Sequence, residues 1–289
     1  MSVVVWSAGR LVDPAAPLLT PVDHGVTVGD GVFETCAVRH GQVFALTRHL
    51  RRLALSAAGL GLPVPDEAEV RAGAAAVLAA APDAGRLRIT VTAGPSPLGP
   101  ARAPDDEIAP TLLVAAAPAG HGGATTARAV TVPWVRNERS SIAGLKTTSY
   151  AEQVAILRHA RAEGADEALV ANTVGDLCEG AASNVFVARG GEVLTPPLSS
   201  GCLAGVTRDL VLEWSADAGL PVRAAAPGEL RYDAVVHEVL TGTAALALSG
   251  SVRGLTPVVE LDGTPVEPGD AFEAVRALYV RRSAEDLDP

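Results

Sequence analysis

Lys146 has the surroundings best suited to chemistry in this sequence. It lies in the segment Gly144-Leu145-Lys146-Thr147-Thr148-Ser149-Tyr150, among small and hydroxyl-bearing residues. A lysine amine can form a covalent C=N bond with a carbonyl compound, and it can also carry a proton. An arbitrary lysine is a solvated surface residue. A site at Lys146 therefore requires partners elsewhere in the chain.

Glu179 is the first candidate partner, because it ends a short apolar stretch and precedes Gly-Ala-Ala and a predicted strand. A carboxylate beside a pyridine nitrogen keeps that nitrogen protonated, so the ring can accept electrons from a carbanion. Taken alone, Glu179 could equally be a carboxylate in a turn. Together, Lys146 and Glu179 supply two functions that a pyridoxal enzyme needs.

Two turns rich in hydroxyl groups and glycine are candidate anion sites. The first enters a predicted helix at Val206 and Thr207, where backbone N–H groups are available to a phosphate. Thr207 as a simple helix cap is the alternative. The second turn, Thr241-Gly242-Thr243, follows a predicted strand at 235–240 and would offer donors to the same anion. It could also be only a loop.

A predicted helix near residue 50 supplies a further candidate for anion binding. His49 and Arg52 are three residues apart, so both project to one side of the helix, whereas Arg51 is expected to face solvent. The planar guanidinium of Arg52 could pair with a phosphate as a two-pronged donor.

The bulk composition excludes several classes of protein. A formal net charge of −10 argues against a nucleic-acid surface. No apolar run approaches the ~18 residues of a membrane span, and no signal peptide is indicated, so we expect a cytoplasmic protein. The three cysteines form no CxxC pair and the histidines are scattered, which predicts neither a disulfide scaffold nor a metal site. The GxxxxGK[ST], GxGxxG and HExxH signatures are also absent.

Apolar periodicity predicts an α+β protein of two domains. A small N-terminal domain, 1–117, has a hairpin, further strands and two helices, which start at Thr47 as a cap and near Asp66. The Gly- and Pro-rich stretch 118–124 is the predicted linker. The larger domain, 125–289, has short strands, including 168–171 and 185–188, and helices at about 150–163, 206–218 and 271–282.

Six segments in order resemble the class IV pyridoxal 5'-phosphate aminotransferases. They are GDGVFET, HLRRL, LKTTSY, CEGAASNVF, LAGVTR and TGTA, and they span nearly the whole chain. The family contains branched-chain and D-amino-acid aminotransferases and 4-amino-4-deoxychorismate lyases. The resemblance implies a fold type IV enzyme, similar to D-amino-acid aminotransferase, that forms a homodimer with active sites at the domain interface.

The resemblance also implies roles for individual residues. Lys146 would bind the cofactor covalently and shuttle protons, and Glu179 would contact the pyridine nitrogen. Phe33, Arg88 and Tyr150 are candidate substrate contacts. The complete set of expected cofactor contacts is Arg52, Lys146, Glu179, Ser183, Asn184, Leu203, Val206, Thr207, Gly242 and Thr243.

The loop at 93–100 bears on the reaction. It has neither the Arg nor the His with which the D-amino-acid enzymes of this family trap the substrate carboxylate. Arg88, on the preceding strand, is an alternative carboxylate anchor, although it could equally be a structural ion-pair partner. The chain is most similar to aminodeoxychorismate lyase-like proteins, which predicts release of 4-aminobenzoate and pyruvate. The alternatives are an aminotransferase for branched-chain L-amino acids, D-amino acids or (R)-amines, and a non-catalytic cofactor-binding protein.

Overall fold

The computed structural model describes residues 3–104, 106–118 and 125–289, which form two compact units. The first unit contains the described residues before 119, together with Leu145–Tyr150 and Asp286–Pro289. The second contains residues 125–144 and Ala151–Glu285. Apart from Pro118, the predicted linker lies outside the described residues.

The membership of two segments differs from the prediction, which assigned all of 125–289 to one domain. Leu145–Tyr150 belongs to the first unit because its backbone pairs with strand β3: Phe33 N–H donates to the Lys146 carbonyl at 3.0 Å, and Thr148 N–H donates to the Gly31 carbonyl at 2.8 Å. Asp286–Pro289 joins the same unit through contacts with helix α2, such as Ala45 N–H to the Leu287 carbonyl at 2.7 Å. Backbone pairing between such distant segments leaves no local sequence pattern.

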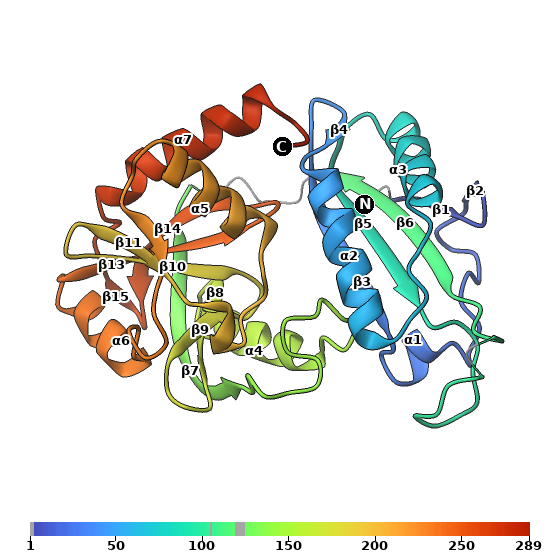
Figure 1. Ribbon diagram of the computed structural model, residues 1–289, viewed down its shortest axis with the longest axis horizontal. Helices are drawn as coiled ribbons and strands as arrows, with labels where there is room; N and C mark the ends of the chain where they lie inside the picture. Colours follow the sequence, from blue (N-terminus) through green and yellow to red (C-terminus); the bar gives the residue numbers. More distant parts are fainter. Residues whose placement is uncertain (1–2, 105, 119–124) are drawn as a thin grey trace. The chain divides into compact units, whose positions relative to one another are not determined.

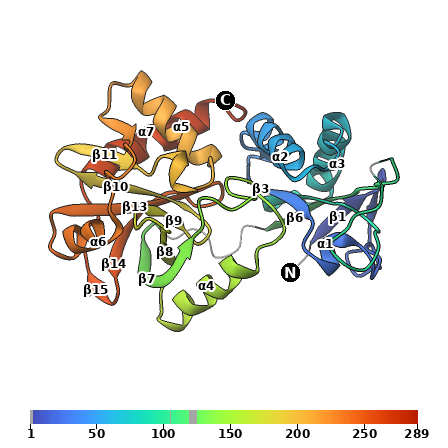
Figure 2. The ribbon, with the colours of Figure 1, turned by 60° about the horizontal axis from the view of Figure 1, so that its bottom comes forward.

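The first unit is built on a six-stranded antiparallel sheet in the order β2-β1-β6-β5-β3-β4 (Figure 1). Helices α2 and α3 lie over one face of it (Figure 2), where Leu53 and Val77 join Leu87 and Ile89 in an apolar core. Because side chains alternate along a strand, Phe33 of β3 is on the other face, which these helices do not cover. The elements are β1 (Val4–Ser7), β2 (Arg10–Val12), α1 (His24–Thr27), β3 (Gly31–Arg39), β4 (Gln42–Val43), α2 (Leu46–Leu60), α3 (Glu67–Ala80), β5 (Ala84–Thr92) and β6 (Thr111–Pro118).

Helix α2 starts two residues earlier than predicted. Ala45 is in the N-cap position with φ 54°, and it has no side-chain group that could cap the helix. The expected cap, Thr47, lies within the first turn, and its hydroxyl group contacts Asp288 instead. The prediction for α3 is confirmed, since the Asp66 carboxylate accepts from Ala68 N–H at 3.0 Å.

The second unit is built on a nine-stranded mixed sheet in the order β12-β11-β10-β13-β14-β7-β8-β9, with β15 paired to β14. Its apolar interior includes Val185, Leu246 and Val258. No helix of the described residues is long and apolar enough to cross a membrane. The elements are β7 (Ala127–Arg136), α4 (Ala151–Ala162), β8 (Glu167–Asn172), β9 (Leu177–Gly180), β10 (Asn184–Arg189), β11 (Glu192–Thr195), a 3-10 turn (Leu198–Ser200), α5 (Val206–Asp217), β12 (Val222–Ala224), α6 (Tyr232–Leu240), β13 (Ala244–Gly250), β14 (Gly254–Leu261), β15 (Thr264–Pro265) and α7 (Ala271–Glu285).

The strand predicted at 235–240 is wrong, because this segment is part of helix α6. Val235 and Val239 are both buried and are four residues apart, which is the spacing of one helix face. The cluster of β-branched residues suggested a strand, but the burial follows the helical period. The strand begins only at Ala244.

Substitution of Gly94 tests the close packing of the loop at 93–100 against the backbone of Ala109. Gly94 has φ 76°, and a Cβ there would overlap the Ala109 carbonyl oxygen. Gly9 has φ 78° but nothing within 4 Å of its Cβ position, so it is a matched control for backbone strain alone. We expect Gly94→Ala to lower the free energy of unfolding in urea by at least about 1 kcal/mol more than Gly9→Ala. Equal losses would contradict the close contact.

Candidate active site

The backbone of Lys146 is fixed within the first unit on two sides. Its segment runs along the edge of β3, with a bridge between Val32 and Thr147. Its N–H donates to the hydroxyl of Ser56 on α2 at 3.1 Å. The Thr148 hydroxyl donates to the Gly29 carbonyl at 2.7 Å, which anchors the following turn. The segment is therefore positioned by both the sheet and the helix.

The Lys146 amine lies in a group of aromatic and basic side chains. Nζ is 3.4 Å from the hydroxyl of Tyr150 and 4.4 Å from the ring centroid of Phe33. The two rings meet edge to face, with centroids 5.0 Å apart. The guanidinium carbon of Arg88 is 3.8 Å from the same Phe33 centroid. The structure thus brings together Lys146 and all three predicted substrate contacts.

Lys146 is also the only lysine among the 289 residues. No other side chain can form a C=N bond through an ε-amine. Counting lysines would have strengthened the sequence argument for this position without any structural information.

A buried ionic cluster in the first unit involves Arg52. Glu34 of β3 is completely buried and accepts hydrogen bonds from Arg52 Nε at 2.7 Å and Nη2 at 2.6 Å. His49 Nδ1 is 2.7 Å from the same carboxylate. His49 and Arg52 do share one side of α2, and Arg51 is exposed, as predicted. Two of the three guanidinium nitrogens of Arg52 bind Glu34, a partner that the sequence gave no reason to expect, and phosphate binding by Arg52 stays a prediction.

The protonation of the cluster follows from burial and charge. Burial raises the pKa of Glu34, but the charge and hydrogen bonds of Arg52, with the hydrogen bond to His49, outweigh it and lower the pKa to about 2. Burial lowers the pKa of His49 despite its contact with Glu34. The cluster is therefore an Arg–Glu ion pair with a neutral imidazole donating to it.

In the second unit, Glu179 of β9 is held at both oxygens. Arg136 Nη2 lies 3.1 Å from Oε1, and the backbone N–H of Leu203 donates to Oε2 at 2.9 Å. Arg136, the last residue of β7, also pairs with Glu152 at 3.0 Å. Sequence analysis missed Arg136, because its link to Glu179 joins two strands that are far apart in the chain.

Val206 and Thr207, the predicted phosphate contacts, are the first two residues of α5, and anion binding there stays a prediction. The N-cap residue of α5, Gly205, provides no capping side chain, so the first N–H groups of the helix have no partner there. A Cβ at Gly205 would overlap Asn184 Oδ1, and Asn184 Nδ2 donates to the Leu203 carbonyl at 2.8 Å. Thr207 lies within the helix and is not its cap. Asn184 and Leu203 therefore lie beside the expected phosphate site.

Ser183 has a partner that the sequence did not indicate. Its hydroxyl donates to Glu167 at 2.7 Å, and Glu167 is a buried carboxyl group. Burial raises the pKa of Glu167. A contact between Ser183 and the cofactor stays a prediction.

The structure contradicts a shared anion site for Thr243 and the N-terminus of α5. In the β10–β13 pair, Asn184 lies opposite Ser249 and Arg189 lies opposite Ala244. Gly242 and Thr243 are thus at the opposite end of β13 from Asn184, about 20 Å away at 3.3 Å per residue. At the Asn184 end of the sheet, β13 finishes with Ser249 and Gly250. The error followed from predicting the strand before Thr241 instead of after it.

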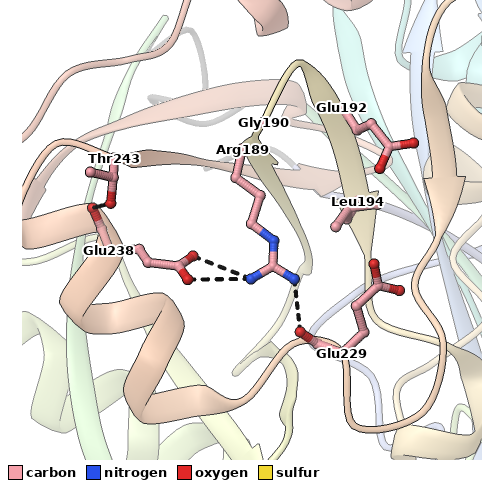
Figure 3. Close-up of a pocket in the computed structure, with 7 residues that line it drawn as sticks. All are labelled: Arg189, Gly190, Glu192, Leu194, Glu229, Glu238 and Thr243. Atoms are coloured by element: carbon pink, nitrogen blue, oxygen red, sulfur yellow. Dashed lines mark hydrogen bonds and ion pairs between the residues drawn. The ribbon is translucent and has the colours of Figure 1, made fainter.

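The actual surroundings of Thr243 are acidic (Figure 3). It lines a cavity of about 440 Å³ with Arg189, Glu192, Glu229 and Glu238. Arg189 pairs with Glu238 at 3.3 Å and donates to the Glu229 carbonyl at 2.8 Å. With three carboxylates around one arginine, this cavity would repel a phosphate. Among the described residues, no group of His, Cys, Asp and Glu side chains is arranged to hold a metal ion.

Replacing Glu34 with Gln tests the buried ion pair. A carboxyl group whose pKa is lowered on folding contributes stability above its ordinary pKa, and this contribution is lost as the pH falls toward the folded-state value of about 2. We expect Glu34→Gln to be destabilising near pH 6, and the difference from the native protein to shrink by about 2 kcal/mol near pH 3. Urea unfolding at both pH values measures this. Glu69→Gln, at an exposed acid of α3, is the control; a pH-independent difference for Glu34→Gln would contradict the assignment.

Comparisons with known proteins match most of the chain. The amino-transferase class IV family model matches residues 31–261. A bifunctional aminodeoxychorismate lyase / D-amino acid transaminase of Mycobacterium tuberculosis is 32% identical over 235 residues, 73% of this chain and 77% of that protein.

Solved structures show the same relationship over nearly the whole chain. The fold IV transaminase CpuTA1 of Curtobacterium pusillum superposes with a TM-score of 0.80 at 31% identity, covering 97% of this chain and 98% of that one. The 4-amino-4-deoxychorismate lyase of Pseudomonas aeruginosa gives 0.78 at 30% identity, covering 99% and 100%. A PLP-bound hypothetical aminotransferase of M. tuberculosis gives 0.83 at 28% identity, covering 96% and 97%. The chain therefore has fold type IV and belongs to the class IV aminotransferases, a family of pyridoxal 5'-phosphate (PLP)-dependent enzymes.

Proposed function

We propose that this enzyme is a PLP-dependent lyase that converts 4-amino-4-deoxychorismate into 4-aminobenzoate and pyruvate. The observation that carries the proposal is the position of Arg88 beside Lys146. Its Nε donates to the Thr90 hydroxyl at 3.2 Å and its guanidinium group stacks on Phe33, but no carboxylate of the described residues pairs with it. A fixed guanidinium without an acidic partner is suited to bind a substrate carboxylate.

The loop at 93–100 supports Arg88 as the anchor. The nearest arginine after the loop, Arg102, is committed to structure: it forms a two-pronged pair with Asp30 at 2.6 Å and donates to the Leu60 and Gly61 carbonyls at 2.8 Å. His24, buried beneath the loop, binds the Pro97 carbonyl at 2.9 Å. Both side chains are therefore engaged in contacts within the first unit.

The fit to PLP rests on an amine, a carboxylate and an anion site. Bound PLP supplies an electron-accepting ring. In the proposal, Lys146 binds the aldehyde carbon, and Glu179, oriented by Arg136, pairs with the pyridine nitrogen. The N–H groups of Val206 and Thr207 bind the phosphate.

In the proposed reaction, Lys146 Nζ removes the proton from the substrate ring carbon that bears the nitrogen. The C–O bond to the enolpyruvyl group then breaks, the ring becomes aromatic, and the enolpyruvyl group leaves as an enolate. The enolate takes up one proton at its methylene carbon to become pyruvate, which balances the proton removed by Lys146. The Tyr150 hydroxyl, 3.4 Å from Nζ, orients the amine for this transfer.

A second candidate function is transamination, which uses the same residues. The relative from M. tuberculosis is named as both a lyase and a D-amino acid transaminase. In transamination the proton removed by Lys146 returns to the cofactor, so an amino acid alone converts the enzyme stoichiometrically to its pyridoxamine form. Release of pyruvate from aminodeoxychorismate, without that conversion, identifies the lyase. Conversion by amino acids without pyruvate release would replace the lyase proposal with transamination.

We also propose that the enzyme is a homodimer. The first unit exposes Val22, Val26 and Val28 around α1 and Leu98 in the adjacent loop, and Leu98 is 79% exposed. Exposed apolar side chains of this size are typical of protein–protein interfaces.

Reduction with borohydride tests whether Lys146 binds the cofactor covalently. Because the chain has one lysine, a lysine-specific protease cuts the denatured protein once. Reduction of the holoenzyme fixes the cofactor to the amine, and we expect the denatured product to resist cleavage. The apoenzyme treated in the same way is the control and should be cut. Cleavage of the reduced holoenzyme at Lys146 would refute the covalent role.

Substitution of Arg88 tests the carboxylate anchor. Arg86 lies two residues earlier on the same face of β5, is exposed, and forms no ion pair with a described residue, so Arg86→Ala is a matched control. We expect Arg88→Ala to raise KM for aminodeoxychorismate, with a loss in kcat/KM of at least about 10-fold. Arg86→Ala should have little effect. If the two variants had similar kinetics, Arg88 would not be the group that binds the substrate carboxylate.

A further inference from the structure

Helix α2 receives its N-terminal cap from the last residues of the sequence. The N-cap residue, Ala45, is buried, adopts φ 54° and offers no capping side chain. The Asp288 carboxylate instead accepts from Thr47 N–H at 2.7 Å and from the Thr47 hydroxyl at 2.6 Å. An N-cap side chain normally forms such a bond to the first turn. Here the capping carboxylate is 241 residues away in sequence.

Further contacts fix the segment Asp286–Pro289, called the tail here, at this position (Figure 1). Ala45 N–H donates to the Leu287 carbonyl at 2.7 Å, and Arg48 Nε donates to the Pro289 carbonyl at 2.8 Å. Leu287 and Asp288 also line a groove of about 550 Å³ between β4, α2 and α3. Polar and apolar parts of the tail therefore both contact the first unit.

The electrostatics favour a carboxylate at this position. The N-terminal end of a helix carries a partial positive charge, which attracts an anion. Arg71 of α3 donates from Nη2 to the Thr47 hydroxyl at 2.8 Å, so its charge lies near the Asp288 carboxylate. The Thr47 hydroxyl donates to Asp288 and accepts from Arg71, which links the tail, α2 and α3 in one chain of hydrogen bonds.

We propose that the tail is a conformational strap whose docking orders the first turns of α2 and so positions His49 and Arg52 against Glu34. His49 lies directly after the residues that the tail contacts, and Arg52 one turn beyond Arg48. When the tail is released, the Thr47 N–H loses its acceptor, Asp288. The N–H of Ala45, a residue in the left-handed conformation, loses its hydrogen bond to the Leu287 carbonyl. The fraying of the helix then begins next to the buried ionic cluster.

Hydrogen exchange on the full-length holoenzyme tests the strap. We expect Asp288→Ala to speed the exchange of peptides covering residues 44–52 on the order of fivefold, the effect of losing one N-cap, while α3 stays protected. Asp288→Asn keeps an oxygen that accepts from Thr47 N–H, so it should restore most of the protection. Glu285→Ala removes an exposed charge just before the tail, which lies 3.9 Å from Arg281 on the same helix, and should change nothing.

Unchanged exchange at residues 44–52 in Asp288→Ala, or an equal effect of Glu285→Ala, would overturn the proposal. The dissociation constant for PLP gives a second readout, which rests on the role in phosphate binding that the sequence predicts for Arg52. We expect it to rise in Asp288→Ala and to recover in Asp288→Asn. Faster exchange with an unaltered PLP dissociation constant would support the strap and refute the role of Arg52 in phosphate binding. The two measurements therefore test the strap and the role of Arg52 independently.

Discussion

The carboxylate of Glu34 is completely excluded from solvent, and the first unit depends on how its charge is compensated. An unpaired charge at such a position would cost several kcal/mol. Arg52 and His49 provide the compensation from helix α2, while Glu34 itself belongs to β3. The ion pair therefore fixes the rotation and height of α2 over the sheet. Ser56, one turn beyond Arg52 on α2, accepts a hydrogen bond from the N–H of Lys146, so the same helix that compensates Glu34 also positions the only lysine.

The second unit also contains an acid that is bound by an arginine from another element. Glu179 is nearly buried, and it is held between the Arg136 guanidinium and the Leu203 N–H. A carboxylate fixed at both oxygens keeps one orientation. The proposed contact of Glu179 with a ring nitrogen requires such a fixed orientation. In each unit, an arginine from a different element binds a buried acid and fixes its position.

The sequence predicted most elements, because amphipathic periods and glycine-rich turns are local signals. It also selected Lys146, Glu179 and the N-terminus of α5 as candidate cofactor contacts, and these roles stay predictions. Most of the failures share one physical origin. No local pattern indicates a contact between residues that are distant in sequence. Such contacts fix Glu34, Glu179, Ser183 and the N-terminus of α2. The misplaced turn at Thr243 arose differently: valines that suggested a strand at 235–240 are buried with helical spacing, since packing outweighs β-propensity.

The single lysine also has a consequence for observing this enzyme. A preparation labelled with ¹⁵N only in lysine carries one labelled ε-nitrogen, so its side-chain spectrum reduces to the signal of one atom. Any change in the bonding or protonation of that nitrogen would appear without assignment or overlap. The chain, with 22 arginines and one lysine among its 23 strongly basic residues, thus contains its own site-specific probe.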